Sequence, residues 1–133
     1  MTVSLLVIAH ENIGSVMIDT VAHMLGNSPL SAEVIAVPPD CDPDLVFAKA
    51  EKKLSSLDNG DGVLVLTDIY GSTPGNIASK LDSQGKVKIV AGLNLPMLIR
   101  VMNYPKLNLD KLAEKAVSGG RDGVMICQSE KND

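Results

Sequence analysis

The stretch that decides the fold is residues 62–76, GVLVLTDIYGSTPGN. Its first five residues, 62–66, form a short run rich in Val and Leu, which is typical of a strand buried on both faces of a sheet. A polar turn follows, and Thr73-Pro74 then marks a helix start, because proline fits the first turn of a helix. The stretch therefore predicts a strand, a loop and a helix in immediate succession.

The same succession of strand, loop and helix is predicted in both directions along the chain. Similar apolar runs at 3–8, 33–37 and 87–93 predict three further strands, and 123–127 predicts a last short one. Helical spacing of apolar residues predicts helices over 13–25 and 43–57, the second capped by Asp42. Further helices are expected from residue 73, from residue 95, and over 109–118, the last closed by Gly119-Gly120.

Strands that alternate with helices predict an α/β fold with a doubly wound, mainly parallel sheet. The order expected for this length is 2-1-3-4, with a final strand at 123–127. The 133 residues fit a single domain over 1–133, in which 128–133 form a short polar tail.

Composition excludes several classes of function. The chain holds 12 basic and 16 acidic residues, which gives a net charge of −4, and only 3 aromatic residues. Nucleic-acid binding is therefore not expected, because few basic residues can bind phosphates and few aromatic rings can stack on bases. No apolar run is long enough for a membrane helix, and residues 1–9 lack the features of a signal peptide. Cys41 and Cys127 form no CxxC motif and are expected to be free thiols in a cytoplasmic protein.

The order of the sheet selects a candidate site. In doubly wound sheets the ligand crevice lies beyond the carboxyl ends of the strands, between strands one and three. His10 follows the first strand and Asp68 follows the third, so we expect them to meet there. Beside them, backbone amides of the Gly71-Ser72-Thr73 turn at a helix start favour an anion such as phosphate.

These residue types suit phosphoryl transfer through a histidine. An imidazole with one unprotonated nitrogen is a good nucleophile, and a carboxylate on the other nitrogen fixes the tautomer and balances the positive charge that forms. The chain shows no cluster of metal ligands at standard spacing, so no metal or organic cofactor is expected. Asp40, Asp42 and Asp44 are spaced like calcium ligands, but Leu45 occupies the position where such a loop needs glycine, and helix capping explains them better.

Three segments also resemble the mannose-family IIA domain of the bacterial phosphoenolpyruvate-dependent sugar phosphotransferase system. These are LLVIAH at 5–10, residues 62–76 with their similarity to D-x-x-G-G-[ST]-P-x-N, and VAGLNLPML at 90–98 with its similarity to A-G-x-N-[IL]-P-M-L. The chain departs from the family pattern at Glu11, where glycine is usual, and at Ser72, which replaces the second glycine of the turn.

The resemblance implies a phosphohistidine carrier. His10 would accept the phosphoryl group on Nε2 from the histidine phosphocarrier protein (HPr) and pass it to a IIB partner for sugar uptake. Asp68 would orient His10, and Thr73 would supply a hydroxyl on the phosphate side. The resemblance further implies a homodimer in which a final antiparallel strand, 124–127, is exchanged between subunits.

Two alternatives remain open on the sequence. The chain could be a stand-alone regulatory IIA protein that signals by its phosphorylation state, or the phosphotransfer subunit of dihydroxyacetone kinase. A two-component receiver phosphorylated on Asp68 is disfavoured, because His10-Glu11 and Gln128 stand where an acidic pair and a lysine are needed.

Overall fold

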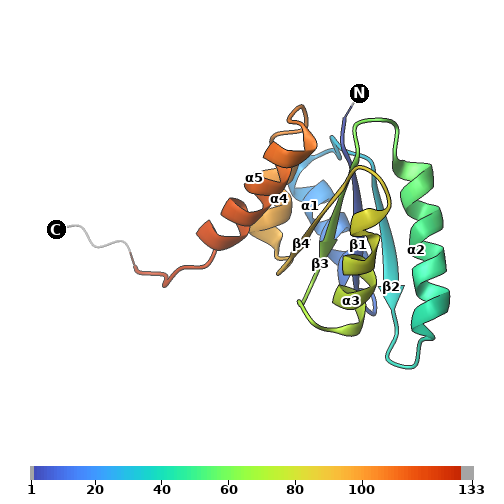
Figure 1. Ribbon diagram of the computed structural model, residues 1–133. Helices are drawn as coiled ribbons and strands as arrows, with labels where there is room; N and C mark the ends of the chain where they lie inside the picture. The colour runs from blue at the N-terminus through green and yellow to red at the C-terminus, as the bar shows by residue number, and fades with distance from the viewer. Residues whose placement is uncertain (1, 130–133) are drawn as a thin grey trace.

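The computed structural model describes residues 2–129 and contains one four-stranded sheet with the order β2-β1-β3-β4 (Figure 1). All three strand pairs are parallel. The strands are β1 (Ser4–His10), β2 (Ala32–Val37), β3 (Val63–Thr67) and β4 (Val87–Ala91). The predicted fold class and strand order are confirmed.

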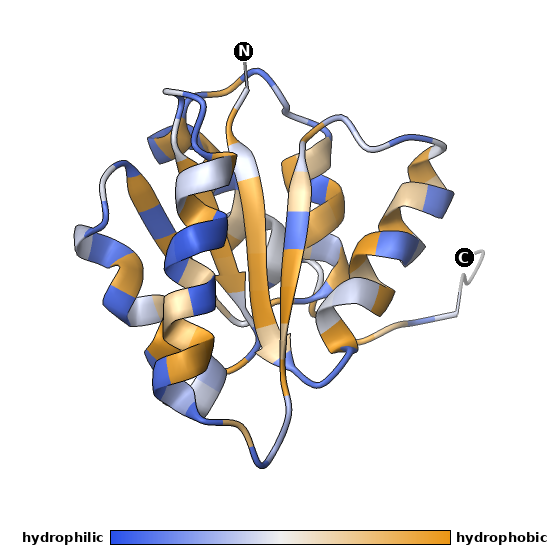
Figure 2. Cartoon of the chain, turned by 90° about the vertical axis from the view of Figure 1, so that its right-hand side faces the viewer, coloured by the Kyte–Doolittle hydropathy of each residue, from blue (hydrophilic) through white to orange (hydrophobic). Residues whose placement is uncertain are grey.

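The two central strands owe their burial to helices on both faces of the sheet. The helices are α1 (Ile13–Leu25), α2 (Pro43–Leu57), α3 (Thr73–Ser79), α4 (Leu95–Met102) and α5 (Leu109–Asp122), with a 3-10 turn η1 (Lys80–Ser83). Helices α1, α4 and α5 cover one face and α2 and α3 the other, so the sheet separates two apolar clusters. The strands form the hydrophobic centre of the molecule in Figure 2.

Local signals explain why the first two helices begin and end where predicted. Gly26 adopts the left-handed conformation, φ 80°, and its amide bonds the carbonyl of Ala22, which ends α1. The side chain of Asp42 accepts a hydrogen bond from the amide of Asp44, and Pro43 takes the first helical position of α2.

The predicted end of the fifth helix is wrong. Gly119 and Gly120 do not stop α5, which continues to Asp122. Both glycines are buried where α5 crosses α4, and a Cβ atom on Gly119 would lie 2.4 Å from Cβ of Arg100. Their role is to let the two helices approach closely.

The predicted last strand is also absent from the part of the chain that the structure describes. Residues 124–129 pair with no strand there and lead away from the body of the molecule (Figure 1). Val124, Met125 and Ile126 are exposed, and β4 is left as a sheet edge. Of the predicted polar tail, residues 130–133 lie outside the described residues. Within residues 2–129, every helix is too short or too polar to span a bilayer.

Candidate functional site

The carboxyl ends of β1 and β3 bring His10 and Asp68 into contact, as the strand order predicts. Oδ2 of Asp68 lies 2.8 Å from Nδ1 of the His10 ring and accepts the backbone amide of His10 at 3.0 Å. The carboxylate is 11% exposed, whereas the His10 side chain is 39% exposed. The orienting group is therefore largely shielded, and the ring it holds reaches solvent.

The environment of Asp68 keeps its carboxyl group ionised. Burial by itself raises the pKa of Asp68, but the hydrogen bonds from the His10 amide and ring, the charge of His10 and the amide of Ile69 lower it. The net effect places the pKa of Asp68 below its ordinary value. An ionised acceptor at Nδ1 fixes the proton on that nitrogen and leaves the lone pair on Nε2.

The turn at 68–72 is shaped by its own hydrogen bonds. Gly71 has φ 82°, a conformation that side chains disfavour. The hydroxyl of Ser72 donates to the carbonyl of Ile69 at 2.7 Å and accepts the amide of Gly75 at 3.3 Å, so it caps α3. Of the three residues expected to bind phosphate, Ser72 therefore has a structural use for its hydroxyl, while the Thr73 side chain is exposed.

Glu11 occupies the position where the sequence departs from the family pattern. Its φ of 50° lies in the left-handed region, which explains why glycine suits this position. Its amide bonds the carbonyl of Val37 at 2.9 Å and so joins the loop after β1 to the end of β2.

Other residues near the site have structural roles that sequence reasoning missed. Asn94, in the loop after β4, caps α4 by accepting the amide of Met97 and donates to the carbonyl of Gly120 at 3.1 Å, so it ties α4 to α5. The hydroxyl of Thr67, directly before Asp68, is buried without a hydrogen-bond partner among the described residues. A polar residue at the end of an otherwise apolar strand is the sequence signal that would have identified Thr67.

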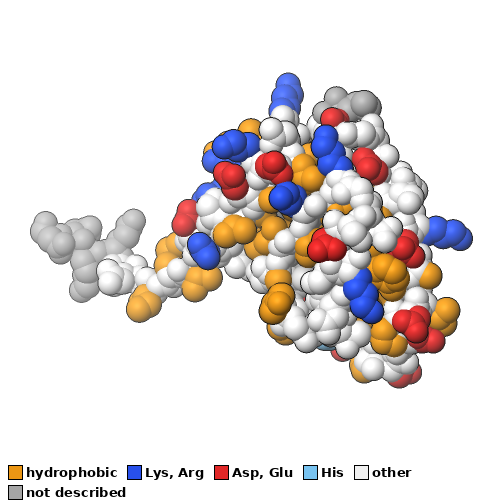
Figure 3. Space-filling view, in the orientation of Figure 1, with side chains coloured by type: hydrophobic (Ala, Val, Ile, Leu, Met, Phe, Trp, Pro, Cys, Tyr) orange, Lys and Arg blue, Asp and Glu red, His pale blue; other side chains and the backbone are white. Residues whose placement is uncertain are grey.

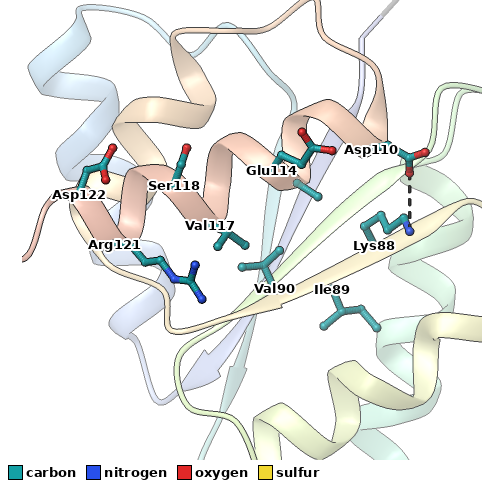
Figure 4. Close-up of a pocket in the computed structure, with 10 residues that line it drawn as sticks. Lys88, Ile89, Val90, Asp110, Glu114, Val117, Ser118, Arg121 and Asp122 are labelled. Atoms are coloured by element: carbon teal, nitrogen blue, oxygen red, sulfur yellow. Dashed lines mark ion pairs between the residues drawn. The ribbon is translucent and has the colours of Figure 1, made fainter.

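The structure also contains a groove that lies away from His10. This groove of about 810 Å³ runs between β4 and α5, lined by residues that include Val90, Val117 and Arg121 (Figure 4). An ion pair between Lys88 and Asp110, 3.7 Å apart, closes one end. The groove follows the open edge of the sheet and contains neither His10 nor Asp68, so its size gives it no part in the chemistry of that pair.

The His10–Asp68 pair has the geometry of an oriented nucleophile. One ring nitrogen is held by a carboxylate and the other is left with its lone pair on a solvent-reaching ring. Backbone amides of the Gly71–Thr73 turn and the start of α3 follow Asp68 directly and favour an anion. Among residues 2–129, no three His, Cys, Asp or Glu side chains gather into a metal-binding group.

Comparison with known proteins places the chain in a family. The family model described as "PTS system fructose IIA component" matches residues 4–117. The chain is 28% identical over 133 residues to the PTS system mannose-specific EIIAB component of Escherichia coli K12, covering 98% of this chain and 41% of that protein. It is also 29% identical over 113 residues to the transcriptional regulatory protein LevR of Bacillus subtilis, covering 80% of this chain and 12% of LevR.

A solved structure has the same architecture. The mannose/sorbose-specific IIA subunit of the phosphotransferase system from Enterococcus faecalis superimposes with a TM-score of 0.89 over the whole of both chains, at 25% identity. The curated relatives are longer: this chain spans about two fifths of the mannose-specific protein and about one eighth of LevR.

Proposed function

Because the chain belongs to the family of PTS system fructose IIA components, we propose that it carries a phosphoryl group on His10 in the cytoplasm. The observation that supports this role most directly is the 2.8 Å contact between Nδ1 of His10 and Oδ2 of Asp68. This contact leaves Nε2 as the attacking atom.

The transfer needs one bond to form and one to break. The lone pair on Nε2 of His10 attacks phosphorus, and the phosphorus–nitrogen bond of the phosphohistidine on HPr breaks, with its electron pair returning to the donor ring. The proton on Nδ1 of His10 stays in its bond to Asp68, whose charge balances the phosphorylated ring. Amides of the Gly71-Ser72-Thr73 turn and the Thr73 hydroxyl bind the phosphoryl oxygens. No metal or organic cofactor takes part.

We propose that a IIB partner then takes the phosphoryl group for sugar uptake. The similarity to a mannose-specific EIIAB component supports this direction. A second candidate output is regulation by phosphorylation state, which the similarity to the transcriptional regulatory protein LevR favours. Both outputs use the same histidine and differ in the protein that receives the signal or the group.

We further propose that the protein is a homodimer in which residues 124–127 of one subunit pair with a sheet edge of the other. The exposed apolar side chains of Val124, Met125 and Ile126, together with the open β4 edge, support this arrangement. An unpaired edge and an apolar segment would cover each other.

The test follows the phosphoryl group from one protein to the next. Purified chain is incubated with labelled, phosphorylated HPr, and the label on each protein is measured after separation. We expect label on the chain, and discharge when a mannose-family IIB domain is added. Label that enters but resists every IIB domain favours the regulatory output, and absence of label on the chain contradicts the carrier role.

A further inference from the structure

Glu11 has a backbone conformation that residues with a side chain disfavour. Its φ of 50° lies in the left-handed region, and among residues 2–129 every other residue with a positive φ is a glycine. This conformation is costly for a residue that has a Cβ atom and carries no such cost for glycine. Backbone strain is concentrated at functional sites, which makes the carboxylate of Glu11 a candidate for a function.

Hydrogen bonds on both sides hold Glu11 beside the residue that accepts the phosphoryl group. The amide of His10 donates to Asp68, and the amide of Glu11 donates to the carbonyl of Val37 at 2.9 Å. Consecutive Cα atoms are about 3.8 Å apart, so both residues lie at the end of β1. The side chain of Glu11 is exposed, and the ring of His10 also reaches solvent. A phosphoryl group on Nε2 would therefore share this solvent-exposed edge with the carboxylate of Glu11.

The neighbouring loops contain no cation that could neutralise Glu11. Residues 1–48 and residues 54–79 hold neither Lys nor Arg, and the loops after β1, β2 and β3 fall within these two segments. Among residues 2–129, the side chain of Glu11 takes part in none of the ion pairs. In Figure 3 the lowest part of the molecule, where the strands end, shows red side chains but no Lys or Arg. The charge of Glu11 therefore acts on its surroundings without an opposing charge from these loops.

Asp68 and Glu11 affect the phosphorylated ring in opposite ways. Asp68 bonds Nδ1 and balances the positive charge of the phosphorylated ring. The phosphoryl group itself carries about two negative charges at neutral pH, and the carboxylate of Glu11 repels them. This repulsion exists only when His10 is phosphorylated, so it raises the free energy of that state and leaves the free state unchanged.

We propose that Glu11 sets the phosphoryl-transfer potential of His10: its charge keeps the phosphorylated state weakly populated, so that the group passes readily to an acceptor. The inference rests on the proposed carrier role of His10. The exchange is reversible: the bond between phosphorus and the donor nitrogen breaks as the bond to Nε2 forms, and the reverse occurs on return. Glu11 makes no bond in this exchange and acts through its charge alone.

The expected size of the effect follows from the charges. A carboxylate about 8 Å from a group with two negative charges, in water at low salt, changes an equilibrium by about three- to tenfold. Salt screens this repulsion, because the Debye length falls from about 30 Å at about 0.01 M ionic strength to about 3 Å at about 1 M. Backbone strain at Glu11 has no such dependence on salt. Salt therefore separates the effect of the charge from that of the conformation.

The experiment measures the equilibrium of phosphoryl exchange with HPr for a series of variants at position 11. Each variant is mixed at dilution with labelled phospho-HPr, and the label on both proteins is measured once exchange is complete. Glu11→Gln and Glu11→Gly remove the charge, Glu11→Asp keeps it, and Glu11→Lys reverses it. Glu51→Gln, in the middle of α2, changes the net charge of the chain by the same amount away from His10 and serves as the control.

We expect Glu11→Gln to shift the equilibrium toward the phosphorylated chain by about three- to tenfold at about 0.01 M ionic strength, and Glu11→Lys to shift it further. Glu11→Gly should match Glu11→Gln, whereas Glu11→Asp and Glu51→Gln should stay within about twofold of the wild type. At about 1 M ionic strength, all variants should lie within about twofold of the wild type. Altered docking of HPr changes the rate of exchange but not this equilibrium.

The possible failures are distinguishable. If the wild type exchanges label with HPr but Glu11→Gln and Glu11→Lys have its equilibrium, the inference about Glu11 is wrong and the carrier role stands. A shift in Glu11→Gly without one in Glu11→Gln would assign the effect to backbone strain, and it would also overturn the inference. If neither the wild type nor any variant takes label from phospho-HPr, the carrier role fails, and the inference fails with it.

Discussion

One oxygen of Asp68 accepts two hydrogen bonds from the same residue, His10: one from the backbone amide at 3.0 Å and one from Nδ1 of the ring at 2.8 Å. The first bond fixes the end of β1 relative to the loop after β3, and the second fixes the ring relative to that backbone. The orientation of the histidine is therefore built into the pairing of two strands whose contact residues are 58 positions apart in sequence.

Replacing the carboxylate of Asp68, whose Oδ2 accepts both bonds, should slow phosphoryl transfer while preserving the fold. In Asp68→Asn the side chain is neutral, can turn its amide group toward Nδ1, and no longer balances the charged ring. By analogy with carboxylates that orient catalytic histidines, we expect the rate to fall by about 10²- to 10⁴-fold. Timed transfer of label from phospho-HPr measures the loss, and an unchanged rate would remove Asp68 from the mechanism.

The lowered pKa of Asp68 predicts how stability depends on pH. Because the folded state favours the ionised carboxyl, this group stabilises the fold above its unfolded pKa of about 3.9, and the contribution is lost as pH falls through the lower folded pKa. Asp68→Asn should lower the free energy of unfolding by about 1–3 kcal/mol at neutral pH. Urea unfolding from pH 3 to 7 should show that the difference in free energy of unfolding between the variant and the wild type becomes smaller below about pH 4. A difference in free energy of unfolding that becomes larger as the pH falls would contradict this account.

The glycines of α5 predict a packing effect that opposes helix propensity. Alanine is the better helix former, yet its Cβ at position 119 would overlap Arg100 on α4. Gly119→Ala should therefore lower the free energy of unfolding by about 1–3 kcal/mol. Lys111→Ala, on an exposed position of the same helix, should change it by less than about 0.5 kcal/mol. Denaturant unfolding of both variants provides the check, and a stabilised Gly119→Ala would show that the two helices separate easily.

The exposed segment after α5 predicts the oligomeric state. Ile126 is 90% exposed in the single chain, and the proposed strand exchange would bury it at the interface. Sedimentation should give a dimer at micromolar concentration for the wild type and a shift toward monomer for Ile126→Asp. A wild type that sediments as a stable monomer contradicts the exchange.

Much of the fold follows from signals that are local in sequence. The bounds of α1 and α2 are predicted correctly because Gly26 and the Asp42-Pro43 pair act on their own neighbours. The alternation of elements predicts a parallel sheet, and 2-1-3-4 is the strand order expected for a doubly wound sheet of this length. The contact of His10 with Asp68 follows from that order.

The missed features depend on distant parts of the chain. Gly119 looks like a helix terminator until Arg100 of α4 is placed beside it. Asn94 looks like a loop residue near the crevice until the carbonyl of Gly120 comes within 3.1 Å. Helical spacing includes Val16 in the apolar face of α1, yet the structure leaves it 53% exposed, because no other described element covers that part of α1. Such outcomes depend on tertiary contacts that no local pattern contains.

The position of the phosphoryl group tests the central claim most directly. After transfer from phospho-HPr, the label on the wild type and on His10→Ala and His23→Ala is assigned by peptide mass spectrometry and by its stability to acid, alkali and hydroxylamine. His23 is exposed on the last turn of α1 and serves as the matched control. We predict acid-labile, alkali-stable label on His10, full labelling of His23→Ala and none of His10→Ala. Label on His23, or a hydroxylamine-sensitive acyl phosphate on Asp68, would contradict the assignment of His10 as the carrier.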